Sequence, residues 1–247
     1  MTLQLQDITH AYATHTVLDG ITASAEPGRV TVLVGPNAAG KTTLLRISAG
    51  LLHPDAGTVR YKGDDLHALN EAQRAMSVAI ATQRPRSDIP LSVREIIAIG
   101  RHRRLDRSVD PIIDALELGD VLGRPYQSLS VGQQQRVGIA RLLHQHEQGG
   151  LLVLDEPTAP LDPRHSSCLL QLLREAASDG AAVLLSMHDL ALAAAVADDA
   201  WVLDEGVLAH DGHAAEVLHP DALEAAFGLP FERLTRSDGS HWLAPKA

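Results

Sequence analysis

The sequence Val30-Thr-Val-Leu-Val runs directly into Gly35-Pro-Asn-Ala-Ala-Gly-Lys-Thr-Thr43. A continuous run of β-branched and apolar residues predicts a buried strand, and Lys41–Leu52 has the character of a helix. The glycine-rich turn between them fits the pattern G-x-x-x-x-G-K-[S/T] in the strand-to-helix context that this phosphate-binding motif requires. The stretch therefore predicts an α/β protein that binds a nucleotide.

Phosphate groups fit this turn for physical reasons. Backbone N–H groups left free at a helix N-terminus point into the loop and bind phosphate oxygens, with help from the helix dipole. Lys41 is expected to reach the β- and γ-phosphates, and the Thr42 hydroxyl to bind Mg²⁺. The residues predicted to contact the nucleotide here are Gly35, Pro36, Asn37, Ala38, Ala39, Gly40, Lys41, Thr42 and Thr43. Taken alone, the motif does not distinguish a kinase, a GTPase, a helicase and a transporter ATPase.

Two carboxylates, Asp155 and Glu156, follow a second apolar run, Leu151-Leu-Val-Leu. An Asp at a strand end is placed to hold Mg²⁺ beside the phosphates. The next carboxylate is placed to polarise the attacking water as a general base. The alternative is an acidic cap on a buried strand before the turn at Pro157. Because the chain also has the phosphate-binding motif, we favour Asp155 as a metal ligand and Glu156 as the catalytic base.

Composition restricts the class of protein. The formal net charge of −10 over 247 residues argues against a nucleic-acid-binding protein that depends on phosphate neutralisation. A local basic cluster consists of Arg101, His102, Arg103, Arg104 and Arg107. It is interpreted equally well as a solvated helix end or as a docking surface. Cys168 is the only cysteine, no signal-peptide pattern is present, and no stretch approaches the ~20 apolar residues of a membrane-spanning helix. We therefore expect a soluble cytoplasmic protein.

The rest of the chain alternates between strand and helix patterns. Further strands are expected at Leu3–Ile8, Thr16–Ala25, Val59–Tyr61, Val78–Ala81, Leu151–Leu154, Ala182–Ser186 and Ala200–Leu203. Helices are expected at Val93–Gly100, Val109–Leu118, Gln133–His146, Pro163–Ser178 and Asp189–Val196. This alternation predicts a mainly parallel sheet covered on both faces. Segment 90–146 shows helices only, so we interpret it as a helical subdomain inserted into an α/β core made of 1–89 and 147–247.

One of these helices opens with Leu129-Ser-Val-Gly-Gln-Gln-Gln-Arg136, in which Ser130 is placed as the N-terminal cap. Beside the phosphate-binding motif and the acidic strand end, this segment resembles the L-S-G-G-Q signature of the ABC-type ATPases. The order and spacing of the elements match that family along essentially the whole chain. Four smaller matches are Tyr12 as the aromatic residue that stacks on adenine, Gln83 as the Q-loop, Ala159-Pro-Leu-Asp162 as the D-loop, and His188 as the switch histidine.

The resemblance implies a fold and a mode of assembly. The fold is a P-loop NTPase core with a mainly parallel sheet, an N-terminal antiparallel β subdomain and an inserted α-helical subdomain. The activity is hydrolysis of ATP with Mg²⁺ by a head-to-tail dimer of two copies. Ser130, Gly132 and Gln133 of one copy would contact the γ-phosphate that Lys41 of the other copy holds. Asp162 belongs to the same set of nucleotide-contacting residues.

Catalytic roles follow from the same resemblance. His188 would stabilise the γ-phosphate and position the attacking water together with Glu156. Gln83 would join Thr42 and Asp155 at the Mg²⁺ ion and would also belong to the catalytic set. Gln83 and the helical insertion would pass the motion of the dimer to membrane partners.

The sequence departs from the family pattern in three places. Ala38 replaces the usual glycine in the phosphate-binding loop, and its methyl group is tolerated only if φ is negative. Val131 replaces the first glycine of the signature, which puts the packing there in doubt. Pro160 stiffens the D-loop. Because Lys41, Glu156 and the other residues with chemical roles are present, we predict an active ATPase.

The type of transporter is indicated by two segments. The tail from Ala214 to Pro245, and Leu91–Arg101 after the Q-loop, are similar to the ATPases of iron-chelate, haem and cobalamin importers. Gln134-Gln-Arg-Val leans toward the haem members. This resemblance implies polytopic permease subunits, an indirect partner in a substrate-binding protein, no nucleic acid, and a peripheral position on the cytoplasmic face of the membrane. ATPases of zinc and manganese importers are the alternative.

Other classes of protein stay open on the residues alone. A soluble ABC protein of DNA repair or translation would bind DNA or ribosomes instead of a permease, and a P-loop kinase would need a phosphoryl acceptor. The thirteen histidines are scattered without convincing ligand spacing, so we expect no histidine metal site.

Overall fold

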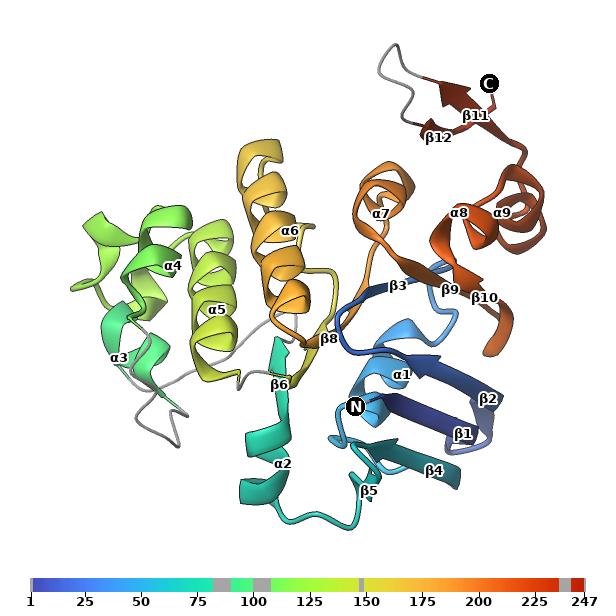
Figure 1. Cartoon of the computed structure of the whole chain (residues 1–247), viewed down its shortest axis with the longest axis horizontal. Helices are drawn as coiled ribbons and strands as arrows, with labels where there is room; N and C mark the ends of the chain where they lie inside the picture. The colour runs from blue at the N-terminus through green and yellow to red at the C-terminus, as the bar shows by residue number, and fades with distance from the viewer. Residues whose placement is uncertain (1, 82–89, 100–107, 147–148, 236–240, 247) are drawn as a thin grey trace.

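The structure, a computed structural model, describes residues 2–81, 90–99, 108–146, 149–235 and 241–246 (Figure 1). Its strands form a six-stranded sheet, a four-stranded sheet and a C-terminal two-stranded hairpin. Helices α3 (Val93–Ala98), α4 (Asp110–Ala115) and α5 (Val131–Gln145) gather on one side of the molecule, away from the four-stranded sheet.

The six-stranded sheet has the order β10-β9-β3-β8-β7-β6. Its strands are β3 (Val30–Val34), β6 (Val78–Ala81), β7 (Leu151–Leu154), β8 (Ala182–Ser186), β9 (Asp199–Asp204) and β10 (Val207–His213). All neighbours pair in parallel except β10, which pairs antiparallel with β9 at the edge. Every residue of β3, β7 and β8 is buried, because a parallel strand covered on both faces needs apolar side chains throughout. The predicted mainly parallel sheet is confirmed.

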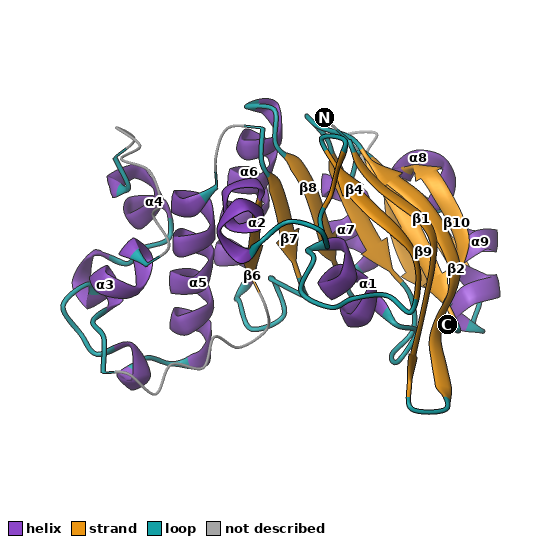
Figure 2. Cartoon of the chain, turned by 90° about the horizontal axis from the view of Figure 1, so that it is seen from below, coloured by secondary structure: helices purple, strands orange, loops and turns teal. Residues whose placement is uncertain are grey.

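The four-stranded sheet is antiparallel and has the order β2-β1-β4-β5. It consists of β1 (Leu3–Tyr12), β2 (His15–Ala25), β4 (Ala56–Tyr61) and β5 (Asp64–Asp65). Helix α1 (Lys41–Ser48) lies between this sheet and the six-stranded one (Figure 2). Its buried apolar side chains, Leu44, Leu45 and Ile47, belong to one hydrophobic cluster with residues of both sheets, among them Ile8 and Trp201. The antiparallel β subdomain that the family resemblance implies is present.

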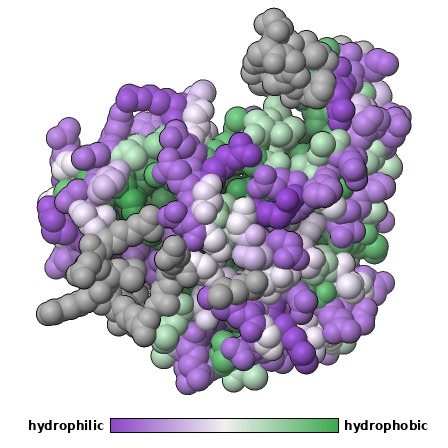
Figure 3. Space-filling view, viewed as in Figure 1, coloured by the Kyte–Doolittle hydropathy of each residue, from purple (hydrophilic) through white to green (hydrophobic). Residues whose placement is uncertain are grey.

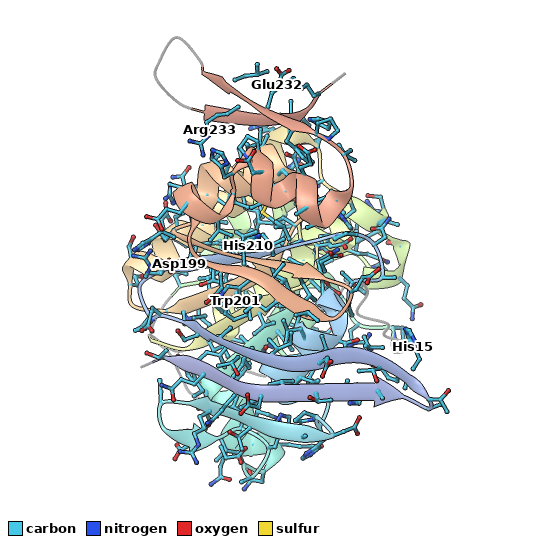
Figure 4. All side chains as sticks on the ribbon, turned by 90° about the vertical axis from the view of Figure 1, so that its right-hand side faces the viewer. His15, Asp199, Trp201, His210, Glu232 and Arg233 are labelled. Atoms are coloured by element: carbon cyan, nitrogen blue, oxygen red, sulfur yellow. The ribbon has the colours of Figure 1, made fainter. Side chains whose placement is uncertain are left out.

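One polar contact joins the two sheets, and an ion pair joins two neighbouring strands of the six-stranded sheet. The Tyr61 hydroxyl on β4 donates to the Gly149 carbonyl at 2.6 Å, just before β7, and burial raises the pKa of Tyr61 to about 12. At the start of β9, the Asp199 carboxylate accepts from Nε and Nη2 of Arg29 at 2.5 and 2.7 Å (Figure 4). This bidentate ion pair joins the N-terminal ends of β3 and β9.

Helices and a hairpin complete the chain. They are α2 (Glu71–Ser77), α6 (Pro163–Ser178), α7 (Leu190–Val196), α8 (Ala214–Val217), α9 (Pro220–Phe227), β11 (Phe231–Thr235) and β12 (His241–Pro245), with 3₁₀ turns at Gly119–Val121 and Tyr126–Ser128. Buried residues of α3 to α9 join those of the sheet in a second hydrophobic cluster. The face of the molecule in Figure 3 is mostly hydrophilic, with hydrophobic side chains in smaller groups. Within the part of the chain that the structure describes, no helix has the length and apolar character to cross a membrane.

Most predicted elements are confirmed, with different ends in some cases. Strands β3, β6, β7 and β8 and helix α6 have the predicted bounds. Helix α1 ends at Ser48 instead of Leu52, because Gly50 adopts φ 71° and closes the helix. Helix α5 begins at Val131, two residues earlier than predicted, directly after its cap. The division into core and helical subdomain stays a prediction, and the basic cluster at 101–107 lies outside the described residues.

Candidate nucleotide-binding site

The phosphate-binding loop lies at the carboxyl end of β3 and leads into α1. A cavity of about 240 Å³ opens over it. The residues that line this cavity are Val17, Asn37, Ala38, Gly40, Lys41, Thr42, Thr43 and Glu156. Six predicted loop residues after Pro36 and the predicted base therefore face one space, although more than a hundred positions separate the loop from the base in the sequence. Val17, on β2, was not predicted; no sequence signal marks it.

Lys41 is held inside the loop. Its Nζ atom donates to the Gly35 carbonyl at 2.7 Å and to the Pro36 carbonyl at 2.8 Å. Burial lowers the pKa of Lys41, while the nearby Glu156 and Asp155 carboxylates act in the opposite direction and favour the charged ammonium. The loop thus places a desolvated cation beside its own backbone N–H groups, which is the arrangement that a polyphosphate needs.

The two glycines of the loop have no possible substitute. A Cβ atom on Gly35 would lie 2.0 Å from the Leu203 carbonyl oxygen. Gly40 adopts φ 104°, and a Cβ atom there would lie 2.8 Å from the Val17 carbonyl oxygen. The loop is packed against β9 and β2 at a distance that only a bare backbone permits.

Ala38 does not meet the condition stated for it. Its φ is 64°, in the left-handed region, so the expectation of a negative φ is wrong. The tight loop needs this conformation between Pro36 and Gly40, and the alanine adopts it at a cost of roughly 1–2 kcal/mol. The departure from glycine is therefore a site of backbone strain.

We expect Ala38→Gly to raise the free energy of unfolding by about 0.5–1 kcal/mol, because relief of the strain exceeds the extra entropy that glycine gives the unfolded chain. Urea denaturation of the full chain measures it. Ala68→Gly is the matched control, since Ala68 is exposed in a turn and is not among the residues with positive φ. The control should be destabilised; equal destabilisation of both variants would contradict the assignment of strain.

The carboxylate of Asp155 is held on both sides at the end of β7. Its Oδ2 accepts from the Thr42 hydroxyl at 2.8 Å, and its Oδ1 accepts from the Ser186 hydroxyl at 2.7 Å. The Ser186 oxygen in turn accepts the Glu156 backbone N–H at 2.9 Å. Ser186 ends β8, the strand between β3 and β7. Sequence reasoning missed it as a site residue, because a serine at a strand end gives no signal until the sheet order is known.

Glu156 and His188 are brought together across two strand ends. Glu156 Oε1 contacts His188 Nε2 in a short ion-pair or hydrogen-bond contact. The Glu156 side chain is 17 % exposed and that of His188 is 46 % exposed, so the pair lies at the edge of the cavity. Glu156 adopts φ 47°, a conformation that costs energy and that clusters at functional sites. The predicted partnership of these two residues is geometrically possible in this chain.

The oxygen atoms of Thr42 and Asp155 fit a magnesium ion. Mg²⁺ binds hard oxygen ligands and typically takes one or two carboxylates together with substrate phosphates. No group of three or more His, Cys, Asp or Glu side chains among the described residues is placed to hold a metal ion, and a Mg²⁺ ion shared with phosphates does not require one. Gln83, the third predicted ligand and a predicted catalytic residue, lies outside the described residues.

The signature segment begins α5 and does not line the cavity. Ser130 Oγ accepts the Gln133 backbone N–H at 3.3 Å, and the Gln133 side chain accepts the Ser130 N–H at 3.0 Å, which is a complete capping box. The Val131 side chain is 61 % exposed, so the helix start forms without a glycine there. A Cβ atom on Gly132 would lie 3.0 Å from the Pro160 carbonyl oxygen. Asp162 is likewise outside the cavity and caps α6.

Tyr12 is the last residue of β1 and is 48 % exposed. Its ring packs edge-on against His10, with the ring centroids 4.9 Å apart. It does not line the cavity over the phosphate-binding loop. Its exposed face is compatible with stacking on a base, and that role stays a prediction.

Residues 18–159 match the family described as "ABC transporter". The chain belongs to the ABC transporter family. It is 41 % identical over 226 residues to the hemin import ATP-binding protein HmuV of Pseudomonas entomophila, covering 86 % of this chain and 87 % of that protein. It is 38 % identical to the cobalamin import ATP-binding protein BtuD of Halobacterium salinarum, covering 92 % of this chain and 59 % of that protein.

Solved structures agree with this assignment. The structure of an ATP-binding subunit of an ABC transporter is similar at a TM-score of 0.79 and 26 % identity, covering 92 % of this chain and 94 % of that one. A dimeric ATP-binding cassette bound to ADP and Pi has the same fold, with a TM-score of 0.77 and 24 % identity over 86 % of this chain and 98 % of that one. This chain is an ABC transporter ATPase, and its curated relatives are import ATP-binding proteins.

Proposed function

We propose that this ABC ATPase powers the import of an iron chelate, haem or a cobalamin-type compound through separate membrane permease subunits. The observation that carries the enzymatic part is the convergence of the phosphate-binding loop, Asp155 and Glu156 at the carboxyl ends of β3 and β7. The cargo class is supported by the names of the relatives, hemin and cobalamin import proteins. The zinc and manganese importers of the alternative hypothesis have similar ATPases.

The loop binds the triphosphate of ATP. Backbone N–H groups at the start of α1 and the Lys41 ammonium meet the phosphate oxygens, and Lys41 exchanges its bonds to the Gly35 and Pro36 carbonyls for bonds to phosphate. Thr42 and Asp155, whose side-chain oxygens are already 2.8 Å apart, would hold Mg²⁺, with Gln83 as a further ligand. When bound, Mg²⁺ neutralises charge on the β- and γ-phosphates.

Glu156 accepts a proton from the attacking water. The Ser186 hydroxyl accepts its backbone N–H, and His188 contacts its carboxylate. In the proposed mechanism His188 stands next to the γ-phosphate, where its imidazole stabilises the charge and helps to orient the water; its contact with Glu156 supports this role. The strained backbone of Glu156 is consistent with a carboxylate that must point into the cavity.

A second copy of the chain completes each site. The capped start of α5, where Val131 is exposed, is not part of the cavity within its own chain. In a head-to-tail dimer, Ser130, Gly132 and Gln133 of one copy bind the γ-phosphate held by the other, with Asp162 nearby. The dimeric cassette with the same fold, bound to ADP and Pi, supports assembly as a dimer. Gln83 and the helices of 90–146 pass the motion to the permease, which keeps this subunit at the cytoplasmic face of the membrane.

The test is reconstitution with the permease encoded nearest to this chain. In proteoliposomes with the cognate substrate-binding protein, we expect ATP-dependent transport of radiolabelled haem, cobalamin or ferric chelate from the side of the binding protein to the side of the ATPase, where the label accumulates. Zn²⁺ and Mn²⁺ are tested as alternative cargoes in the same assay. Uptake of Zn²⁺ or Mn²⁺ instead would show that the protein belongs to a zinc or manganese importer. Co-purification with ribosomes or DNA in place of a permease would contradict the proposed import function.

A further inference from the structure

The start of the signature helix and the D-loop are joined inside one chain. Gln135 Nε2 on α5 donates to the carbonyl of Pro157, two residues before the D-loop, at 3.2 Å. The backbone of Gly132 approaches the Pro160 carbonyl so closely that an added methyl group would lie 3.0 Å from it. A third connection runs through His165, a residue of the first turn of α6, to which neither the sequence nor the proposed chemistry assigns a role.

Each ring nitrogen of His165 has a partner on a different element. Nδ1 lies 2.7 Å from Asp162 Oδ2 in the D-loop, and Nε2 lies 2.9 Å from Arg136 Nη1 on α5. A guanidinium only donates and a carboxylate only accepts. With a proton on Nδ1, the ring donates from Nδ1 to Asp162 and accepts at Nε2 from Arg136. One imidazole, 15 % exposed, therefore links the D-loop to the signature helix.

The end of α4 meets the same ring. Arg136 Nη1 also donates to the Leu116 carbonyl at 2.7 Å, and the Glu117 carbonyl shares this donor at 3.3 Å. Glu117 Oε2 lies 3.3 Å from His165 Nε2, and its Oε1 pairs with Arg164 at 2.5 Å. Helices α4, α5 and α6 thus converge on His165.

The ring of His165 is not needed to cap α6. The backbone N–H of His165 already donates to Asp162 Oδ1 at 2.9 Å, which supplies the N-terminal cap. The backbone N–H of His165, followed by its side chain, holds the pKa of Asp162 below its usual value. The ring contact adds a connection from the capped aspartate to Arg136, which a helix cap alone does not require.

We propose that His165 is a positioning residue for ATP hydrolysis, which ties Asp162 to Arg136 so that the D-loop and the signature motif keep one relative position. This rests on the proposed dimer, in which both segments are presented together to the ATP held by the other copy. His165 does not line the nucleotide cavity; it acts through Asp162 and the start of α5. Reacting groups that shift by a fraction of an ångström lose much of their effect on rate.

The experiment uses the full chain with three substitutions of His165, which differ in the ring contacts that they remove. His165→Ala removes both ring contacts. His165→Asn keeps an N–H near the position of Nδ1 for Asp162 but cannot reach Arg136. His165→Gln places an amide oxygen near the position of Nε2 for Arg136 and leaves the backbone cap on Asp162. Four quantities are measured for each: ATPase kcat, Kd for MgATP on the monomer, ATP-dependent dimerisation in a Glu156→Gln background, and Tm.

We expect His165→Ala to lower kcat and to weaken dimerisation by about tenfold each, with the monomer Kd for MgATP within about twofold of the parent. His165→Gln should recover most of the loss and His165→Asn should not. In Arg136→Ala, the further change His165→Ala should have little effect, because the two residues act as one unit.

Several outcomes would overturn this role. Recovery of kcat in His165→Asn would show that the ring only helps to cap α6. A parallel decrease of Tm, of affinity for MgATP and of kcat in His165→Ala would indicate a purely structural role. An unchanged kcat in His165→Ala would show that His165 has no positioning role in ATP hydrolysis. If the Glu156→Gln parent itself fails to dimerise with ATP, the proposed dimer is wrong and the positioning role falls with it. If the parent dimerises and the His165 variants dimerise equally well, the dimer stands and only the role of His165 is wrong.

Discussion

Replacing Glu156 with Gln is expected to lower kcat for ATP hydrolysis by about 10²–10³-fold and to leave MgATP bound with a Kd within a few-fold of the parent. Glutamine has the same shape but cannot accept a proton from water. Its amide can still contact His188, and the Ser186 hydroxyl still receives the backbone N–H of residue 156. Phosphate release under saturating ATP measures kcat, and titration calorimetry measures binding.

A matched carboxylate elsewhere provides the control for this substitution. Glu224→Gln changes the same side chain at an exposed position of α9, and it should keep the parental kcat. A Glu156→Gln enzyme that retains a third of the parental rate would exclude this residue as the base. An equal loss of ATP binding would instead indicate that Glu156 shapes the cavity and does no proton transfer.

Lys41→Ala is expected to raise the Kd for MgATP by about 100-fold or more, since it removes charge-assisted hydrogen bonds that contribute roughly 1.5–3 kcal/mol each. It also leaves the Asp155 and Glu156 carboxylates facing the phosphates without the cation that offsets their charge. Binding of a fluorescent ATP analogue measures the effect, and hydrolysis should fall in parallel at low ATP.

The control for Lys41 is a lysine that contacts no site residue. The Lys62 side chain is exposed and lies over the Tyr61 ring, with Nζ 5.4 Å from the ring centroid, so Lys62→Ala should bind MgATP as the parent does. Because Lys41→Ala removes the donor to two loop carbonyls, its Tm is measured as well. Parental affinity in a folded Lys41→Ala protein would show that the loop binds phosphate through its backbone alone.

The most accurate predictions of secondary structure concern strands whose apolar residue pattern results from burial on both faces. Strands β3, β7 and β8 were found at the predicted residues, because a strand covered on both faces must be apolar along its whole length. The strand β10 escaped prediction for the opposite reason. Its residues are mostly exposed at the sheet edge, so no hydrophobic alternation marks them, and its pairing with β9 alone makes it a strand.

Site residues were likewise predicted where local sequence marks them and missed where it does not. Lys41, Asp155 and Glu156 were predicted because each stands at a fixed short spacing from a glycine of the loop or from the end of an apolar strand. Ser186 was not, since its contact with Asp155 spans 31 positions and depends on the order of strands in the sheet. The sign of φ at Ala38 was likewise beyond the sequence, because the packing of the loop against β2 and β9 imposes it.

By itself, the sequence determined that the chain has a phosphate-binding loop, an acidic strand end and a capped signature helix, since each depends on residues that are neighbours in the chain. Only the tertiary structure decided which of them share a cavity. It placed Glu156 and His188 in contact at the phosphate-binding loop, and it left Ser130 and Gly132 outside on another element. Contacts between distant positions arise from strand order and helix packing, and local sequence patterns do not encode either one.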